Sequence, residues 1–466
     1  MKRQTPVGRL LPSSLTRILA GSLAACVLLL AVLHGHSLRA QTQAAHDHGT
    51  AHAESDAPGH VARDLAMAAP ADVGLSEEGL AKLSAAMRQM IDQGELAGAV
   101  TMVARHGKIV HFETLGKQDL DAGVPMSKDT LFRIYSMTKP IAGVALMTLY
   151  DEGRFQLEDP VEKYIPELAN LEVAAADGPD GNPMVEDPHH KMTIRELVSH
   201  TGGLTYGFFS RSQVDTLYQK ANILDRNSTL KEFVGKLGKI PLRQQPGTQW
   251  HYSVSADVQG YLVEVLSGKP FDVFLNERIF EPLGMRDTAF WVPEEKASRF
   301  SPLYVPDKDG KLVSQGKDEF HIQPKFFSGG GGLVSTAMDY MRFAQMLANG
   351  GELGGVRILE PETVALMHTN QLPASIAEIN PMIGNPGNTF GIDVAIVARP
   401  DGTADHALGK GEYWWYGVGG TWFGINPVQD TIVIGMIQNR GGGAARKARL
   451  ESKKLVYEAI LDPVAN

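Results

Sequence analysis

Strand-like patterns near both ends of the chain, with helical patterns between them, constrain the fold more than any other feature of this sequence. Residues 98–116 (GAVTMVARHGKIVHFETLG) alternate apolar and polar side chains around a tight turn. Residues 411–427 and 431–439 are rich in aromatic and β-branched residues, which favour strands. We therefore predict an α+β fold: an antiparallel sheet built from both ends, flanked by N- and C-terminal helices, with an inserted mainly helical lobe.

The helices that flank this sheet are predicted from apolar spacing. The first spans residues 75–91 and is ended by Gly94, and the last lies within residues 443–461, where the basic residues are interpreted as a solvent-exposed face. A further strand is predicted over 389–397. A single hydrolase domain, 71–466, would have a sheet lobe of about 71–155 and 325–466 and a helical lobe of about 156–324.

The first 70 residues are expected to lie outside that domain. Basic residues precede an apolar run at 18–33, and the small Ala40 follows it, which is typical of an export signal at 1–40. A linker rich in Ala and His would follow at 41–70. This predicts an exported protein, periplasmic or secreted. Membrane attachment would require an uncleaved signal or lipidation of Cys26, which is the single cysteine.

Composition narrows the class of function. The 466 residues are 43% hydrophobic and carry a formal net charge of −9, which fits a globular enzyme with a small-molecule substrate better than a nucleic-acid-binding protein. The sequence contains neither a Gly-x-x-x-x-Gly-Lys-Ser/Thr phosphate loop nor a His-Glu-x-x-His zinc motif. No cofactor and no metal is therefore expected.

A serine and a lysine lie close together at a predicted helix start. Pro140 is tolerated only in the first turn of a helix, so the apolar helix that follows should begin near Ser136. The dipole and unpaired N–H groups there would stabilise a negative charge. Lys139 would lie one turn away and could act as a base if burial keeps it neutral. The bland alternative is a helix cap followed by a surface lysine.

Other parts of the sequence favour chemistry at Ser136. The same Ser-x-x-Lys spacing recurs at 314–317, but in a polar loop without a helix. Tyr252 precedes an amphipathic helix, and a tyrosine beside a lysine ammonium could lose its proton more easily and share the base role. A Gly-rich strand at 411–427 could bring backbone N–H groups to a ligand, and the glycines of 328–333 are expected to let the backbone pass close to the site.

Three short motifs occur in the order S-M-T-K (136–139), Y-S-V (252–254) and W-Y-G (415–417). This set resembles the serine β-lactamase and penicillin-binding-protein superfamily, and in particular the class C β-lactamase-related family VIII carboxylesterases. The resemblance extends over most of residues 75–460 and includes phrases such as IRELVSHTGGL and IFEPLGMRDTAF. It implies a β-lactamase/transpeptidase-like fold.

The resemblance also implies roles for individual residues. Ser136 would be the nucleophile, Lys139 its partner base, and Tyr252 the relay of the proton to the leaving group. The backbone N–H groups of Ser136 and Val418 would form the oxyanion hole. The substrate would contact four further residues of the second and third motifs: Val254, Trp415, Tyr416 and Gly417.

Two departures from the lactamase pattern bear on the substrate. Val254 stands where lactamases carry an asparagine, and Trp415 stands where they carry a lysine that attracts the substrate carboxylate. Both favour neutral small esters, and the aromatic residues at 413–416 and 422 suggest an apolar pocket, although about half of them are expected in the core. A β-lactamase, D-aminopeptidase or acyltransferase, or a penicillin- or peptidoglycan-binding protein without turnover, remain alternatives.

Two histidines could suggest a different catalytic pair. His200 is expected to be structural, and His251 structural or part of a pocket wall. The α/β-hydrolase class is disfavoured, because the sequence has no Gly-x-Ser-x-Gly elbow.

Overall fold

The computed structural model describes residues 63–316, 320–381 and 383–465. The expected signal and linker therefore lie almost wholly outside the described residues, as do Cys26 and the lysine of the second Ser-x-x-Lys. No helix within the described ranges is both long and apolar enough to cross a membrane.

An eight-stranded sheet forms the centre of the sheet lobe, in the order β12-β13-β14-β15-β16-β1-β2-β3. Every neighbouring pair in it is antiparallel, and β16 from the end of the chain pairs with β1 from its beginning. The predicted sheet built from both ends is thereby confirmed. Its strands are β1 (Gly98–Arg105), β2 (Lys108–Asp119), β3 (Val124–Pro125), β12 (Asn388–Phe390), β13 (Ala395–Val397), β14 (Tyr413–Tyr416), β15 (Trp422–Asn426) and β16 (Thr431–Met436).

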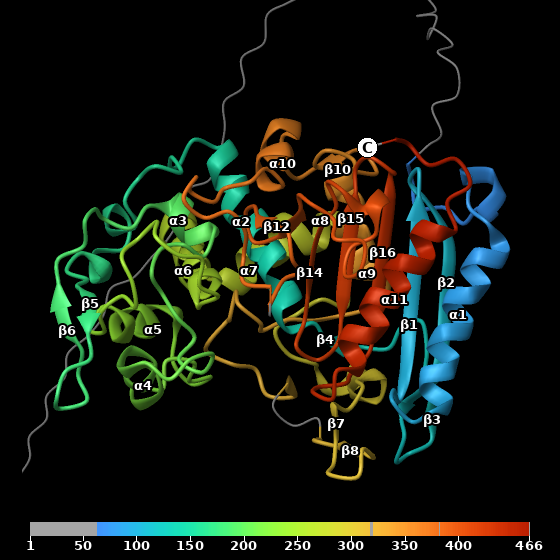
Figure 1. The fold of residues 1–466 in the computed structure, drawn as a ribbon, viewed down its shortest axis with the longest axis horizontal. Coiled ribbons are helices and arrows are strands. Elements are labelled where there is room, and N and C mark those ends of the chain that lie inside the picture. Colours follow the sequence, from blue (N-terminus) through green and yellow to red (C-terminus); the bar gives the residue numbers. More distant parts are fainter. Residues whose placement is uncertain (1–62, 317–319, 382, 466) are drawn as a thin grey trace, which may run out of the picture. The chain divides into compact units, whose positions relative to one another are not determined.

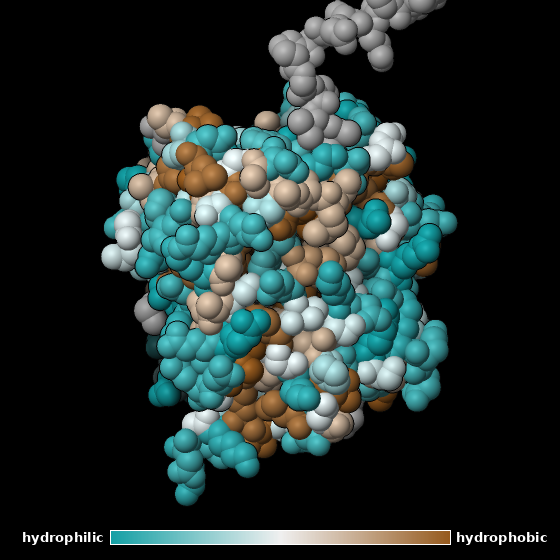
Figure 2. Space-filling model, turned by 90° about the vertical axis from the view of Figure 1, so that its right-hand side faces the viewer, coloured by the Kyte–Doolittle hydropathy of each residue, from teal (hydrophilic) through white to brown (hydrophobic). Residues whose placement is uncertain are grey.

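Strand β1, which has a neighbour on each side, is buried along its whole length because helices cover both faces of the sheet. Its alternate side chains belong to different cores: Ala99 and Val103 pack with α1 (Glu77–Asp92) and α11 (Ala444–Glu458), whereas Met102 packs on the opposite face, near α9 (Ala337–Ala348). In Figure 1, α1 and α11 lie together against the sheet. Figure 2 turns that side of the molecule to the viewer, where mostly hydrophilic residues surround separate hydrophobic groups.

The helical lobe fills the middle of the chain and lies on the left of Figure 1. Two β-hairpins interrupt it, β5 with β6 and β7 with β8.

The remaining α-helices and strands of both lobes are α2 (Thr138–Asp151), α3 (Ile194–Val198), α4 (Gln213–Lys220), α5 (Leu230–Leu237), α6 (Ser255–Ser267), α7 (Phe271–Leu275), α8 (Glu281–Leu283), α10 (Pro361–Met367), β4 (Phe132–Arg133), β5 (Val173–Ala176), β6 (Met184–Glu186), β7 (Tyr304–Pro306), β8 (Leu312–Ser314), β9 (Val334–Ser335), β10 (Glu352–Leu353) and β11 (Val356–Arg357).

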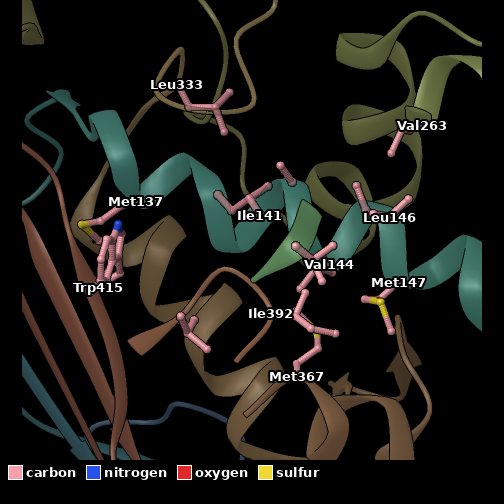
Figure 3. Packing of buried hydrophobic residues seen from close by; sticks show 14 of the residues in the cluster. Met137, Ile141, Val144, Leu146, Met147, Val263, Leu333, Met367, Ile392 and Trp415 are labelled. Carbon is pink, nitrogen blue, oxygen red and sulfur yellow. The ribbon is translucent and has the colours of Figure 1, made fainter. Parts of the chain in front are cut away.

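Helix α2 runs through the core between the sheet and the helical lobe. All of its residues from Thr138 to Leu149 are buried. Figure 3 shows side chains of α2 pointing to both sides: Val144 points toward Ile392 of the sheet lobe, and Leu146 lies toward Val263 on α6 of the helical lobe. Met137, just before the helix, lies beside Trp415. Because packed side chains surround α2, the helix is a rigid support for the side chains of its first turn.

Two sequence predictions about local structure are wrong. The single strand expected over 389–397 is a hairpin of β12 and β13, because the chain turns at Asp393, which has a left-handed φ of 58°. The basic residues of α11 are not all solvated, since Arg449 and Lys453 are buried. Lys453 pairs with Asp405 and Glu412, and Arg449 lies over the ring of Tyr416, so both cations have local partners that compensate for burial.

Candidate active site

Ser136 lies in a single 3₁₀ turn, Tyr135–Met137, that leads directly into α2. The residue before it, Tyr135, has a left-handed φ of 43°, which is unusual for an aromatic residue and marks local backbone strain. Pro140 is the third residue of α2, where its missing N–H leaves no hydrogen bond unmade, as the sequence predicts. Ser136 is partly exposed and lines a cavity of about 830 Å³.

Lys139 is completely buried, and three oxygen atoms surround its Nζ atom. The Nζ atom lies 2.7 Å from Tyr206 Oη, 2.7 Å from the carbonyl oxygen of Gly330 and 3.4 Å from Ser136 Oγ. A carbonyl can only accept, and Tyr206 Oη can also accept, so a neutral amine would use both its protons there and direct its lone pair to Ser136. Burial lowers the pKa of Lys139 to about 8, against the opposing effect of Asp257 and Asp393.

Tyr252 lies on the other side of this pair. Its hydroxyl hydrogen bonds with Ser136 and accepts a hydrogen bond of 3.1 Å from Trp415 Nε1, and its ring centroid is 4.5 Å from Lys139 Nζ. Burial raises the pKa of Tyr252 above its usual value. The sequence-based expectation that Tyr252 loses its proton more easily next to an ammonium is therefore not favoured here, because burial stabilises the protonated phenol.

The glycine-rich segment 328–333 passes close to the site, as the sequence predicts. Asp257 fixes it, because its Oδ1 atom accepts hydrogen bonds from Ser328 Oγ at 2.5 Å and from the Gly330 N–H at 3.0 Å. A Cβ atom at Gly330 would lie 2.5 Å from Asp257 Oδ2 and 2.8 Å from Tyr206 Oη. Only glycine thus lets this carbonyl reach the lysine.

A tight turn after β14 lies against the segment that carries Ser136. Gly417 packs so closely on the carbonyl of Ile134 that a side chain there would clash, and its N–H donates to the Thr421 carbonyl at 2.8 Å. The next residue, Val418, lines the cavity. Its N–H has no hydrogen-bond acceptor among the described residues, so it is available to a ligand.

The structure separates the four residues that the resemblance assigns to substrate binding. Tyr416 lines the cavity with Ser136, and Gly417 lines an adjacent one of about 190 Å³. Trp415 and Val254 are buried and line neither cavity. Trp415 instead packs against the ring of Tyr252 and donates a hydrogen bond to its hydroxyl. Trp415 therefore helps to orient that tyrosine.

Aromatic side chains make up much of the cavity wall. Phe208 and Phe209 are 59% and 48% exposed, which places them at the opening. Arg226 and Arg440 also line the cavity, and no Asp or Glu lines it among the described residues. Further aromatic members of the wall are Tyr206, Trp250, Phe320 and Phe326.

The sequence analysis did not identify three residues that act on the Lys139 amine: one contacts it and two lie near it as acidic groups. Tyr206, Asp257 and Asp393 have no distinctive spacing from the serine, and they reach the site from separate segments. The sequence offered one signal, which was proximity to known motifs. Tyr206 is the second residue after the IRELVSHTGGL segment, and Asp257 lies five residues after Tyr252.

Both histidines have the kind of position that the sequence predicts. His200 is buried and its Nδ1 atom lies 2.9 Å from Ser253 Oγ, which is a structural contact. His251 lines the cavity, and burial lowers its pKa to about 4. Among the described residues there is no cluster of three or more potential metal ligands.

The chain matches the family model described as Beta-lactamase over residues 83–458. It is 37% identical to the protein Rv1367c of Mycobacterium tuberculosis, over 76% of this chain and 89% of that protein. It is 33% identical to the esterase EstB of Burkholderia gladioli, over 74% of this chain and 86% of EstB. The range matched by the family model includes both Ser136 and the strands β14 to β16 at the end of the chain.

The fold is similar to that of solved structures. EstCE1, described as a hydrolase with promiscuous acyltransferase activity, superposes with a TM-score of 0.69 at 26% identity, over 82% of this chain and 99% of EstCE1. The predicted α+β fold of the β-lactamase and transpeptidase type is confirmed by this similarity.

Proposed function

This chain belongs to the Beta-lactamase family and is a serine hydrolase, and on that premise we propose that it cleaves small carboxylic esters through an acyl-enzyme on Ser136, with Lys139 and Tyr252 as the base relay. The observation that carries the proposal is the position of Ser136 Oγ. It faces an aromatic cavity and lies 3.4 Å from the Nζ atom of a lysine that burial can deprotonate near neutral pH.

In the acylation step, neutral Lys139 accepts the proton of Ser136 while Oγ attacks the ester carbonyl carbon. The carbonyl oxygen becomes negative and would be stabilised by the N–H groups of Ser136 and Val418. When the tetrahedral intermediate collapses, Tyr252 donates its proton to the leaving alkoxide and regains one from the Lys139 ammonium. The alcohol leaves, and the acyl group remains on Ser136.

In the second step, water attacks the acyl-enzyme and the same groups act in reverse. Neutral Lys139 accepts a proton from the attacking water through Tyr252, and the resulting ammonium returns that proton to Ser136 Oγ as the bond between the acyl carbon and Oγ breaks. The carboxylic acid product is released and the resting state returns. Because burial raises the pKa of Tyr252, the lysine is the better primary base and the tyrosine is the relay.

An ester fits the cavity better than a β-lactam. The buried Val254 and Trp415 supply no side-chain amide and no cation where lactamases have them, and the wall is largely aromatic. A volume of about 830 Å³ is within the range of ligand pockets and would hold an acyl chain together with an alcohol group.

The decisive experiment is a substrate panel with the purified protein. Nitrophenyl butyrate, tributyrin, D-amino-acid amides and nitrocefin are compared by kcat/KM, and the first turnover is followed for a burst. Burst and steady turnover of esters would support the proposal. A burst without turnover would instead indicate a penicillin-binding sensor, and preferred cleavage of amides would indicate a peptidase.

Acyl transfer is a second candidate, because an alcohol can replace water in the second step. The aromatic opening at Phe208 and Phe209 would favour an apolar acceptor over water, and EstCE1, a similar structure, is described as having such activity. Adding a primary alcohol to the ester assay and quantifying the new ester by mass spectrometry distinguishes transfer from hydrolysis.

We also propose that the protein is exported. The support comes from the sequence, where basic residues and a short apolar run precede Ala40. The mature N-terminus of protein recovered from the periplasm or the medium tests this, and a start near residue 41 is expected. A membrane-bound product that begins at Cys26 would point to lipidation.

A further inference from the structure

His251 lies on the wall of the cavity that holds Ser136, one residue before Tyr252. Its ring is partly exposed, and its Nε2 atom lies 3.2 Å from Thr205 Oγ1. The proposed reaction does not use this histidine. A neutral imidazole has one donor and one acceptor, so the nitrogen that carries the proton decides what the ring can offer to a ligand.

A hydrogen bond to Asp215 fixes the direction of the Thr205 hydroxyl group. Asp215 is buried on α4, and its Oδ2 atom accepts from the Ser212 N–H at 3.1 Å and from Ser212 Oγ at 2.7 Å. Burial disfavours the charge, but hydrogen bonds from neighbouring hydroxyl groups outweigh it and lower the pKa of Asp215. The carboxylate can only accept, so Thr205 Oγ1 donates to Asp215 Oδ1 across the 2.6 Å between them.

This direction determines which nitrogen of His251 carries the proton. The single hydroxyl proton of Thr205 is directed to Asp215, so Oγ1 is an acceptor toward its other two neighbours. These are the Gly207 N–H, at 3.2 Å, and His251 Nε2. Nε2 therefore carries the ring proton, and Nδ1 carries the lone pair. Burial, with Arg243 nearby, lowers the pKa of His251 to about 4, so the ring is uncharged at neutral pH.

The Nδ1 atom of His251 is thus a hydrogen-bond acceptor that has no partner among the described residues. Much of the surrounding cavity wall is aromatic, and the two arginines that line it, Arg226 and Arg440, can only donate. A ligand with a hydroxyl group would pair with Nδ1, whereas a saturated chain would leave this acceptor unpaired. The wall therefore favours a ligand that is largely apolar but carries a donor.

We propose that His251 is a specificity-determining residue: its Nδ1 atom accepts a hydrogen bond from a hydroxyl group of the substrate, so the protein prefers hydroxylated esters to plain alkyl esters. The inference rests on the proposed ester cleavage at Ser136 and names the substrate class of that site. The hydroxyl group can belong to the acyl part, as in an ester of a hydroxy acid, or to the alcohol part, as in a monoester of a diol. Both present the same donor.

The wild-type protein is tested with three esters for each source of the hydroxyl group. The acyl series is the nitrophenyl esters of butyric, 3-hydroxybutyric and 3-methoxybutyric acid, and the alcohol series is propyl, 2-hydroxyethyl and 2-methoxyethyl butyrate. A methoxy group has a similar inductive effect but no proton to donate, so the hydroxy-to-methoxy ratio of kcat/KM isolates the donor. In one series this ratio should be at least about three, as expected for a net hydrogen bond between neutral groups.

Two variants of His251 and a matched control attribute this ratio to the ring nitrogen. His251→Phe keeps a planar ring without an acceptor, so the ratio should fall at least about threefold. His251→Gln can donate to Thr205 Oγ1 from its amide nitrogen and retains an oxygen as an acceptor, so it should keep most of the preference. His368→Phe removes a histidine that stacks on Tyr413 outside the cavity wall, and it should leave the ratio at its wild-type value.

The possible outcomes are distinct. A wild-type ratio of about one in both series, or a ratio that His251→Phe leaves unchanged, would overturn the inference while the proposed ester cleavage stands. An equal loss in His251→Phe and His251→Gln would also overturn it, because the acceptor would then not be the cause. A protein that cleaves none of the six esters would instead refute the proposed ester cleavage. The wild-type comparison needs no substitution, so it decides the question if His251→Phe does not fold.

Discussion

The Nζ atom of Lys139 lies 2.7 Å from the carbonyl oxygen of Gly330, although 191 residues separate the two in the chain. This contact joins the first turn of α2 to a glycine-rich loop that Asp257 holds from α6. One N–H of the lysine donates to this carbonyl oxygen, which can only accept a hydrogen bond. The contact therefore orients the amine toward Ser136, and the following predictions depend on that orientation.

Ser136→Ala should abolish ester turnover and leave the melting temperature nearly unchanged. The serine caps no helix, since neither the 3₁₀ turn nor α2 has a side-chain cap, so little stability is lost with its hydroxyl. Hydrolysis of nitrophenyl butyrate and a thermal melt measure the two effects. Retention of more than about a tenth of the wild-type rate would place the nucleophile elsewhere.

Lys139→Ala and Tyr252→Phe should each reduce kcat/KM by several orders of magnitude, and the double variant should lose little more. The two groups pass one proton between them, so removing either one stops the relay. The values of kcat/KM for the two single variants and the double variant, each compared with the wild type, form a double-mutant cycle. Losses that multiply in the double variant would mean that the two residues act independently.

Activity should rise with pH through a midpoint of about 8, the value to which burial lowers the pKa of Lys139. The ammonium form, which dominates below that pH, has no lone pair for the serine proton, so activity is lost as pH falls. The pH profile of kcat/KM reports the free enzyme. A flat profile between pH 6 and 9 would show that Lys139 is not the base.

Tyr206→Phe should lower kcat by about 10- to 100-fold, because a Lys139 proton loses its acceptor in a buried site and the amine can turn away from Ser136. Tyr413→Phe is the control, since Tyr413 is a buried tyrosine that stacks on His368 outside the cavity wall. The assay is saturating ester turnover for both variants. Equal effects of the two substitutions would indicate lost packing instead.

The value of kcat/KM for nitrophenyl acetate or butyrate should exceed that for nitrocefin by at least about a hundredfold, or 2.7 kcal/mol. A bound β-lactam would leave its amide and carboxylate poorly paired, at about 1 to 3 kcal/mol each, because the buried Val254 and Trp415 offer it neither an amide side chain nor a cation. Tributyrin serves as an unactivated ester in the same comparison. If nitrocefin is cleaved faster than both kinds of ester, the protein is a β-lactamase.

The sequence by itself determined the sheet and the reactive pair. Residues 98–116 show the period of a strand hairpin, and Pro140 allows a helix to begin only just before it, so β1, β2 and the position of Ser136 follow from local physics. Lys139 is three residues from the serine, and their proximity follows from helix geometry alone.

Only the tertiary structure decided what surrounds that pair. Tyr206 and Gly330 contact Lys139 and Asp393 lies near it, each from a distant segment, and no periodicity links those positions in the sequence. The same is true of Trp415, whose aromatic character suggested a substrate wall but which is buried and holds Tyr252. Whether a side chain lines a cavity or fills a core depends on which elements pack against its strand, because both environments favour the same residue types.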